Sequence, residues 1–579
     1  MPESPADYQI PDHLQHSALY SPDLAPIPPE ARTWTRWNLA ALWVGMAVCI
    51  PTYLLASYMI KSGLSWQAAL IIIGLANAVI TLPMVLNGQP GVKYGIPFPV
   101  VGRAAFGTLG IHLPSLLRGL VACGWFGVQT WIGGLSIYAI FNTITGTQST
   151  SELDAGKFVA FGVFWAINIW FIWKGTESIK WLEDYSAPIL IVIGLVLIGW
   201  GWKTVGGLGD VLAQSDQLGK PSVSLTSAAP TNHEDTGLIV HFNPLKMVDG
   251  RLKASKAMVT IRSGDRLTSS GWLPIDAQNM TYRVPSKLGL DTTRFKNGLQ
   301  TLSVQYQNSA RQTSRMIPVT FAAPVQTSST IWSYILWFTA MVGFWATMSI
   351  SISDITRWAK TQADQVAGQF MGLPGTMVFY SFVGIFVTCA AIIAFPDVMI
   401  SEDAPWDPVT LVAKFENPWV VVFAQVALLI ATLSTNIAAN VIAPANAIAN
   451  LFPQKISFRV GGVLAGLAGI AICPWWLLDA ISSLLLWVSG LLGPVLGILI
   501  CDYFLINRKS LSLSDLYDPN GRFAGVRSSA MIALAGGVLV ALSGYWIEAL
   551  SFLYRLSWFS GFAVAFGLYY MLAPKSQPR

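Results

Sequence analysis

Hydroxyl and carboxamide side chains gather in residues 431–440, Ala-Thr-Leu-Ser-Thr-Asn-Ile-Ala-Ala-Asn, within an apolar run long enough to cross a bilayer. Hydrocarbon cannot solvate such groups, so each needs an internal partner, an ion or a substrate. One face of a helix over this segment carries Ala431, Ser434, Thr435 and Ala438. Asn436 and Asn440 stack one turn apart. The segment predicts either a seam between packed helices or a site for a hard cation beside a polar organic molecule.

A second group able to bind an organic ring lies in the apolar run 113–142. Trp125 and Gln129 are one turn apart, so their side chains share a helix face. Tryptophan offers a flat π surface, and the glutamine amide offers both a donor and an acceptor. The pair indicates a site for a planar heterocycle with amide edges, although a core or interfacial tryptophan is the alternative. Gly124 and Gly127 flank Trp125 and clear space beside it.

Two further segments are expected to interrupt a helix near mid-membrane. In residues 44–51, Pro51 lacks an amide hydrogen and Gly45 loosens the chain before it. Residues 341–347 again place a glycine, Gly343, in an apolar run. A proline kink explains one such segment, but breaks in the first and sixth helices are what a five-plus-five inverted repeat produces. Unwound backbone there exposes carbonyl and amide groups to an ion or a substrate.

Composition indicates that these segments belong to a polytopic membrane protein. The 579 residues are 53% hydrophobic and 11% charged, whereas soluble domains carry about 25% charged residues. The five cysteines lie in apolar segments, which argues against a disulfide framework and a zinc site, and the net charge of +5 requires no nucleic-acid partner. Twelve runs are long enough to span about 30 Å: residues 37–60, 66–88, 113–142, 157–173, 186–204, 330–352, 374–395, 418–445, 459–476, 478–504, 528–547 and 552–573.

Charges between these runs predict the orientation of the chain. One set of loops holds Arg32, Arg36, Lys93, Arg103, Arg118, Lys174, Lys180, Arg357, Lys360, Lys455, Arg459, Arg508, Lys509, Arg522, Arg527, Lys575 and Arg579. The opposite set holds Lys61, Lys157, Lys414 and Arg555, with the acidic Glu402, Asp403 and Asp407. This asymmetry places both termini of a multi-pass plasma (inner) membrane protein in the cytoplasm. Residues 1–36 are polar and proline-rich and do not read as a cleavable signal peptide.

Residues 205–329 depart from the membrane pattern. Alternating runs at 257–261, 302–306 and 317–321 are typical of strands, and Asn297-Gly298 is a strong turn signal. We expect an inserted extracytoplasmic β-sandwich-like domain, resembling bacterial immunoglobulin-like domains, without a catalytic or metal cluster. It is a partner-binding module, a delivery or gating element, or a spacer. The predicted domains are a cytoplasmic tail 1–36, a first repeat 37–204, the insertion 205–329, a second repeat 330–504, a cytoplasmic loop 505–527, two helices 528–573 and a cytoplasmic tail 574–579.

The chain resembles the nucleobase–cation symporter-1 family, whose members carry hydantoins, allantoin, uracil, cytosine and related rings. The resemblance covers the twelve-helix part nearly end to end, and its short motifs share an order and spacing. They are Asp23-Leu24-Ala25-Pro26 with Arg32 and Trp34; Gly63-Leu64-Ser65; residues 94–100 with Arg103 and Phe106-Gly107; residues 125–129; residues 343–347 with Asp354 and Arg357; and Ser434-Thr435-Asn436 through Asn440. It implies an all-α, leucine-transporter-like fold that works by alternating access, with the large insertion as a departure from the family.

The resemblance also implies site residues. A sodium ion would be held by backbone carbonyls of Gly45, Val48 and Ala431 and by the hydroxyls of Ser434 and Thr435. Such a set of neutral oxygens suits a monovalent hard cation better than a divalent one. Asp354 is the alternative carrier of a coupled proton, although its place beside Thr356 and Arg357 indicates the cytoplasmic end of the sixth helix. Sodium is favoured, and protons remain the alternative because some family members use them.

The implied substrate lies between Trp125 and an aromatic residue of the sixth helix, with Gln129 and Asn440 at its polar edges. Trp345 is favoured over the adjacent Phe344 as that second ring, and both follow Gly343. Cys49 stands where some relatives carry glutamine or asparagine, which leaves the substrate's identity open. Asn436 has no assigned role beyond bracing the site.

The function expected from these residues is import of a nucleobase-like heterocycle, of the uracil, allantoin, hydantoin, cytosine or purine class, by cation symport. The alternative is a membrane sensor or transceptor whose outer domain binds a ligand or a protein partner. An enzyme is not expected, because the spans contain no metal-ligating histidine pair and no nucleophile–base set. No cofactor is expected beyond the coupling cation.

Overall fold

The computed structural model describes residues 10–61, 64–147, 153–212, 222–227, 235–243, 254–264, 266–276, 278–296, 300–309, 311, 313, 316–319, 330–394, 408–413, 415, 417–476 and 481–574. Several residues used above lie outside these ranges: 1–9, Gly63, Asn297, Gly298, Thr320, Phe321, Glu402, Asp403, Asp407, Lys414 and 575–579.

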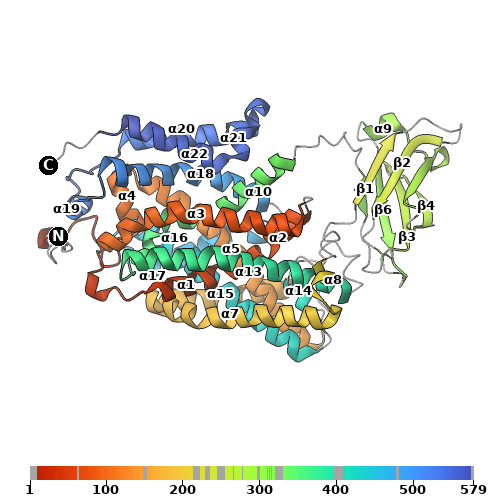
Figure 1. Cartoon of the computed structure of the whole chain (residues 1–579), viewed down its shortest axis with the longest axis horizontal. Coiled ribbons are helices and arrows are strands. Elements are labelled where there is room, and N and C mark those ends of the chain that lie inside the picture. The colour runs from red at the N-terminus through yellow and green to blue at the C-terminus, as the bar shows by residue number, and fades with distance from the viewer. Residues whose placement is uncertain are drawn as a thin grey trace.

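The helices form one elongated bundle (Figure 1). Its first part contains α1 (Arg36–Ala47), α2 (Ile50–Lys61), α3 (Trp66–Tyr94), α4 (Phe98–Phe106), α5 (His112–Thr145), α6 (Ala155–Lys174), α7 (Thr176–Val205) and α8 (Leu208–Leu212). Its second part contains α10 (Thr330–Phe344), α11 (Ala346–Ser351), α12 (Ser353–Thr356), α13 (Gln362–Ala394), α14 (Pro408–Val412), α15 (Pro418–Asn440), α16 (Ile442–Leu451), α17 (Phe458–Ala471), α18 (Ile481–Cys501), α19 (Leu513–Tyr517), α20 (Ser528–Trp546), α21 (Ser551–Arg555) and α22 (Ser557–Leu572).

Eight described helical segments are long and apolar enough to cross a membrane, and a ninth is counted if α22 and the bent segment before it form one span. Fewer segments satisfy this criterion than the twelve expected runs because several runs are interrupted. The run 37–60 is divided into α1 and α2, and the run 330–352 into α10 and α11. The helices at Ile331–Phe344 and Phe458–Ala471 are apolar but shorter than a single span requires.

Local sequence signals explain where the long central helices begin and end. The Ser65 hydroxyl caps α3 by accepting a hydrogen bond from the Ala68 amide at 3.2 Å. Gly95 ends α3 in the left-handed region at φ +70°, where a side chain is strained. A Cβ there would also lie 2.3 Å from the Ile27 carbonyl oxygen, so this glycine lets the N-terminal segment pack on the helix end.

Strands occupy the segment between α8 and α10. They are β1 (Ser222–Ser227), β2 (Asp235–Asn243), β3 (Lys256–Ser263), β4 (Arg266–Pro274), β5 (Thr281–Pro285), β6 (Gln300–Gln307) and β7 (Ile317–Val319), with a short helix, α9 (Thr292–Lys296). Two small antiparallel sheets result, in the orders β1-β2-β5 and β4-β3-β6-β7. Their buried residues form one hydrophobic cluster that includes Val240, Val259 and Val304. Figure 1 shows the sheets beyond the end of the bundle near α2 and α8.

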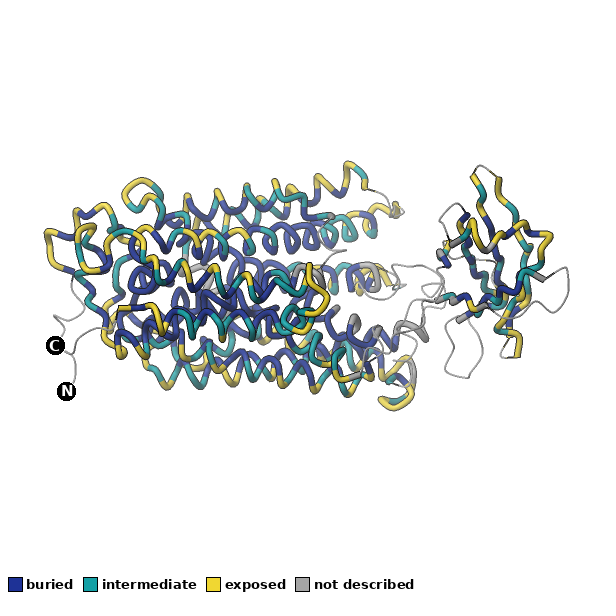
Figure 2. Tube along the Cα trace, turned by 90° about the horizontal axis from the view of Figure 1, so that it is seen from above, coloured by how far each residue is buried: buried dark blue, intermediate teal, exposed yellow. Residues whose placement is uncertain are grey.

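Buried residues run through the middle of the bundle, as Figure 2 shows, and many of them belong to α5 and α15. Helix α15 packs against α5, α1 and α7, and α3 packs against α13. Small residues permit the closest approaches: a Cβ on Gly127 of α5 would lie 2.3 Å from the carbonyl oxygen of Gly469 on α17. Gly124 was also expected to clear space, but a Cβ on Gly124 would meet no atom of the described residues within 4 Å.

The prediction that Arg103 and Arg118 lie in loops is wrong. Arg103 belongs to α4 and Arg118 to α5, and their side chains are 0% and 1% exposed. The charge rule counts such cations as if they were free in a loop, but both donate hydrogen bonds inside the protein. The Arg103 guanidinium donates to the carbonyl oxygens of Leu516 at 2.9 Å and Leu19 at 3.0 Å and to the Asn450 side chain at 2.6 Å.

Buried arginines also hold the N-terminal segment against the end of the bundle near α4 and α19. Arg357 donates to the carbonyl oxygens of Asp23 at 3.0 Å and Ala25 at 2.7 Å. Arg32 donates to the Ile27 carbonyl at 2.9 Å and also to that of Val92. Main-chain carbonyls therefore accept most of the hydrogen bonds that fix residues 19–27 in place.

Candidate functional site

The site begins at the break between α1 and α2. Val48, at the end of α1, has φ −78° and ψ 77°, which is outside the helical region. Cys49 follows it, and α2 starts at Ile50. The sequence prediction of an interruption before Pro51 is therefore confirmed, and the last turn of α1 has carbonyl groups without helical partners beyond it.

Helix α15 lies directly against this break. The Thr435 hydroxyl donates to the Gly45 carbonyl oxygen at 2.9 Å and lies 3.3 Å from that of Met46. The Ser434 hydroxyl accepts a hydrogen bond from Ser186 of α7 at 3.1 Å. Two adjacent hydroxyls of α15 thus contact oxygens of α7 and α1, and we call these hydroxyl and carbonyl oxygens the oxygen group.

Two of these oxygens were not identified from the sequence. Met46 is an apolar residue whose contribution is its backbone carbonyl, and no side-chain pattern reports on a carbonyl. Ser186 lies two residues before Pro188 in the fifth apolar run, where a buried hydroxyl beside a proline is a usable signal. Val48 lies at the break and Ala431 is buried on α15, and participation of their carbonyls stays a prediction.

The donor chemistry of this oxygen group fits a monovalent hard cation. Its members are hydroxyl and carbonyl oxygens, which are neutral, whereas divalent ions usually take carboxylates as well. In the described part of the chain, no cluster of three or more histidine, cysteine or acidic residues exists that would hold a transition metal.

Asn436, which had no assigned role, joins three helices, α5, α6 and α15. Its Nδ2 lies 3.1 Å from both the Thr130 hydroxyl of α5 and the Asn168 Oδ1 of α6. Its Oδ1 accepts a hydrogen bond from Asn440 Nδ2 at 3.1 Å. Through these contacts, Asn436 fixes both the rotation of α15 and the orientation of the Asn440 amide at the end of that helix.

The aromatic residues of the sixth helix divide their contacts between two neighbours. Helix α10 ends at Phe344, and Trp345 has φ −100° and ψ 6° before α11 begins, which confirms the predicted break. The Phe344 ring meets Trp125 edge to face, with centroids 5.7 Å apart. The Trp345 ring instead packs on Trp43 of α1 at 5.1 Å. In this structure Phe344, and not the favoured Trp345, is therefore the ring that contacts Trp125.

Gln129 lies on the same face of α5 as Trp125 and is 2% exposed. Its Oε1 is buried and has no hydrogen-bond partner among the described residues. A buried amide oxygen without a partner is costly, so such an atom at a site is available to a ligand's N–H group.

Cys49 lies at the break between α1 and α2, near side chains of both proposed ligand sites. Its sulfur is 3.3 Å from the Thr52 hydroxyl, and its thiol interacts with the side chains of Gln129 and Thr435. The residue that departs from the family pattern thus interacts with Thr435, predicted for the ion, and with Gln129, predicted for the substrate. A substitution at Cys49 should therefore affect both Thr435 and Gln129.

Gly343 contributes space and not a polar group. A Cβ at this position would lie 1.8 Å from the Ser489 hydroxyl oxygen of α18, and that hydroxyl is held by the Leu485 carbonyl at 2.6 Å. The glycine therefore lets the end of α10 lie directly on α18 just before the break.

Arg118 and Asp354 occupy the buried region below these groups, toward α4. Arg118 donates to the Ser351 hydroxyl at 3.1 Å and to the Ala439 carbonyl at 3.1 Å, which joins α5 to α11 and α15. The Asp354 carboxylate accepts a hydrogen bond from the Phe98 amide at 2.9 Å and lies within electrostatic range of Arg357 and Arg118. Its contacts hold α12 to the start of α4.

Comparison with known proteins gives a consistent result. A family model described as a permease for cytosine/purines, uracil, thiamine and allantoin matches residues 26–231 and 319–561. The allantoin permease of Bacillus subtilis is 30% identical over 578 residues, which is 97% of this chain and 95% of that protein. The purine-uracil permease of Arabidopsis thaliana is also 30% identical, over 96% of this chain and 77% of its own length.

Solved structures share the fold at lower identity. A nucleobase–cation symport-1 family transporter, in a closed conformation with bromovinylhydantoin bound, superposes with a TM-score of 0.66 at 21% identity, covering 96% of this chain and 95% of that one. An outward-open sodium-coupled sialic acid symporter gives 0.55 at 10% identity, covering 95% and 93%. The chain therefore has the leucine-transporter-like fold of these symporters.

Proposed function

The chain belongs to the family of permeases for cytosine/purines, uracil, thiamine and allantoin, and we propose that it imports a planar heterocycle with amide edges together with sodium. Alternating access of the two broken helices around the site would carry both across the membrane. The relatives are permeases and not enzymes, and none of these comparisons favours a sensor.

The proposed substrate site lies between α5, α10 and α15. Trp125 and Phe344 supply the apolar faces, and the unpartnered Gln129 Oε1 accepts from a ring N–H. The Asn440 amide, oriented by Asn436, supplies the opposite polar edge. An imide or ureide ring, as in allantoin, hydantoin or uracil, has the alternating N–H and C=O groups that such amides recognise.

The observation that carries the coupling proposal is the contact of Thr435 with the unwound end of α1. A cation shared by the Thr435 hydroxyl and the α1 carbonyls would hold α15 to that break, and the same α15 presents Asn440 to the substrate. Ion and substrate would then stabilise one arrangement of the helices, which makes their binding reciprocal. Sodium suits these neutral oxygens, and Asp354 would serve α12 structurally and not as a proton carrier.

We further propose twelve spans in two inverted repeats, residues 37–204 and 330–504, followed by residues 528–573. Broken helices count as single spans in this assignment, which explains why fewer continuous helices pass the length criterion. The insertion 205–329 would lie outside the cell and both termini inside. In support, the family model leaves residues 232–318 unmatched, and most strands fall in that gap.

The test is a thermal-shift panel on the purified protein. Allantoin, hydantoin, uracil, cytosine and a purine are each added in sodium chloride and in choline chloride. We expect at least one ring to raise the melting temperature, and sodium to enlarge that increase. Stabilisation that is equal in both salts at every pH tested would contradict sodium coupling, and no stabilisation by any ring would contradict the substrate class.

A further inference from the structure

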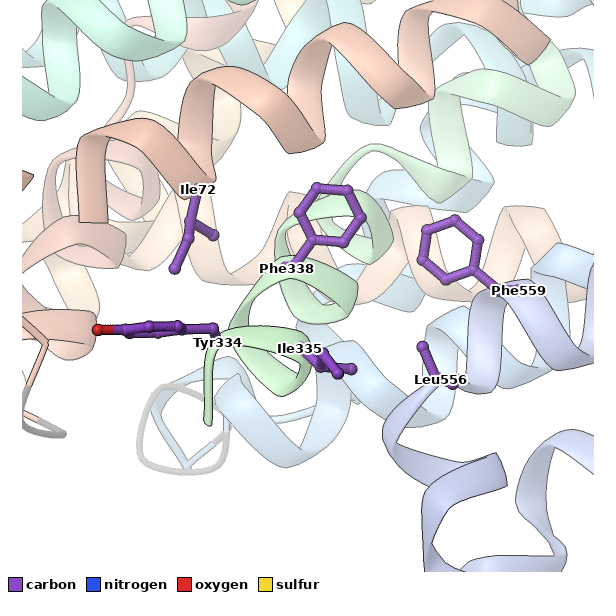
Figure 3. A pocket seen from close by; sticks show the side chains of 6 residues that line it. All are labelled: Ile72, Tyr334, Ile335, Phe338, Leu556 and Phe559. Atoms are coloured by element: carbon purple, nitrogen blue, oxygen red, sulfur yellow. The ribbon is translucent and has the colours of Figure 1, made fainter. Parts of the chain in front are cut away.

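An apolar groove lies on the bundle away from the proposed site (Figure 3). Six residues line it: Ile72 of α3, Tyr334, Ile335 and Phe338 of α10, and Leu556 and Phe559 beside and within α22. Its volume is about 410 Å³. The Tyr334 hydroxyl is the one polar side-chain group among the six, and we call this feature the α10–α22 groove.

Aromatic rings form the floor of the groove and its surroundings are exposed. The Phe338 and Phe559 rings stack at 5.9 Å with an interplanar angle of 11°, which joins α10 to α22. Ile71, next to Ile72, is 60% exposed, and Ile331, one turn before Ile335 on α10, is 66% exposed. In a chain with membrane-spanning helices, such a surface faces lipid tails, so the natural content of the groove is hydrocarbon.

A cation lies at one end of the groove. The segment Glu548–Arg555 meets α22 at an angle of 87°, and Leu556 at this bend lines the groove. The Arg555 guanidinium lies over the Trp332 ring at 5.5 Å, one turn along α10 from Ile335. The one ion pair found in the described part of the chain joins Arg36 to Asp364, so Arg555 has no carboxylate partner there.

Aromatic side chains mark the same end as a bilayer interface. Tyr545 packs on Trp487 at 5.1 Å, on Trp546 at 5.4 Å and on Tyr554 at 5.6 Å. Tyrosine and tryptophan prefer the headgroup level of a membrane. Because Tyr554 precedes Arg555, the guanidinium lies at the depth where lipid phosphates are found.

We propose that the α10–α22 groove binds one acyl chain of a phospholipid whose phosphate pairs with Arg555. Hydrocarbon fills the groove along the Phe338–Phe559 stack, and the charged end reaches the bend at Leu556. A bound lipid would therefore bear on α10, the half of the sixth helix that ends at Phe344. The site is separate from the proposed function, since it requires neither the heterocycle nor the cation.

Native mass spectrometry of the delipidated full-length protein tests this proposal. The protein is titrated with palmitoyl-oleoyl phosphatidylglycerol and, in parallel, with dioleoylglycerol, which has acyl chains but no phosphate. We expect the first phosphatidylglycerol molecule bound per protein to bind more tightly than those that follow. Ile335→Trp, which fills the groove, should abolish this binding, whereas Leu75→Trp, at a 57% exposed position of α3 outside the groove, should not.

The charge is tested separately in case the filled groove disturbs folding. Arg555→Gln should lower the affinity for the tightly bound phospholipid about tenfold, the order expected for one hydrogen bond to a charged group. Arg266→Gln in β4 is the matched control and should change nothing. Equal binding of dioleoylglycerol, unchanged binding in both Ile335→Trp and Arg555→Gln, or a dimer that Ile335→Trp dissociates would each overturn the proposal.

Discussion

The Thr435 hydroxyl lies 2.9 Å from the carbonyl oxygen of Gly45, which joins α15 to the end of α1. The next residue, Asn436, ties the same helix to α5 and α6 and orients Asn440. A single helix thus carries a contact to the proposed ion site and a contact to the proposed substrate site. Helix α15 alone could therefore couple the binding of the proposed ion to that of the proposed substrate.

Replacing Thr435 with valine should weaken sodium-dependent substrate binding about tenfold and leave sodium-free binding nearly unchanged, because the hydroxyl contacts the α1 carbonyls. Thr432→Val is the matched control, since that hydroxyl donates to Leu428 of its own helix at 2.7 Å. Calorimetry with and without sodium measures both variants. Equal losses in the two salts would argue against an ion site at Thr435.

Replacing Phe344 with leucine should lower substrate affinity by up to about tenfold, the scale of one aromatic contact. Trp345→Phe should have a smaller effect, because it keeps a ring against Trp43. A competition binding assay compares the two variants, with the heterocycle that raises the melting temperature most in the thermal-shift panel as ligand. A larger loss in Trp345→Phe would restore Trp345 as the stacking residue and contradict the present register.

Asn436→Ala should destabilise the protein by roughly 1–3 kcal/mol, because it leaves buried polar groups of Thr130, Asn168 and Asn440 without this partner. Uptake should fall as well, since the Asn440 amide loses its orientation. Thr130→Val removes one partner and should cost less. Melting curves of the detergent-solubilised protein and uptake into vesicles measure the two effects. An unchanged melting temperature in Asn436→Ala would contradict the proposed role of Asn436.

Gly343→Ala should destabilise the protein by about 1–3 kcal/mol, because the new methyl overlaps the Ser489 hydroxyl. Adding Ser489→Ala should recover part of this loss, so the double variant departs from additivity. Gly162→Ala on α6, where no atom lies within 4 Å, is the neutral control. Additive effects at 343 and 489 would show that the two positions are not in contact.

Replacing residues 215–325 with a short glycine–serine linker should leave substrate affinity within about twofold of the full chain, since the strands have their own hydrophobic cluster. Binding is measured on purified protein, and surface expression is followed separately. A large loss of affinity in a well-folded shortened protein would assign the insertion a part in substrate binding.

Periodicity and residue chemistry predicted the local features of the site. They located both helix breaks, at Val48 and Trp345, because proline and glycine act on the backbone next to them. They also placed Thr435 on a polar face. They did not predict Asn168 or Ser186 as partners, because a contact between helices depends on packing and rotation, which one helix's sequence does not specify.

The same limit explains the aromatic register and the arginines. Phe344 and Trp345 are adjacent, and which ring meets Trp125 depends on the dihedral angles at the break. A charge count treats Arg103 and Arg118 as loop cations. In the structure they lie in the interior and donate hydrogen bonds to carbonyl oxygens far away in the sequence. Sequence reports the charge of such residues, whereas tertiary structure determines whether it faces solvent.

The carbonyl anchoring of residues 19–27 has a practical side for protein engineering. Because Arg103, Arg357 and Arg32 bind the main chain there, side-chain substitutions in this stretch should be tolerated more readily than shortening. A chain trimmed past residue 27 would remove both carbonyl acceptors of the buried Arg357 guanidinium and one acceptor each from Arg103 and Arg32. Leaving a buried charge without its partners is strongly destabilising. Purification handles and fluorescent fusions are therefore better joined ahead of this stretch than substituted for it.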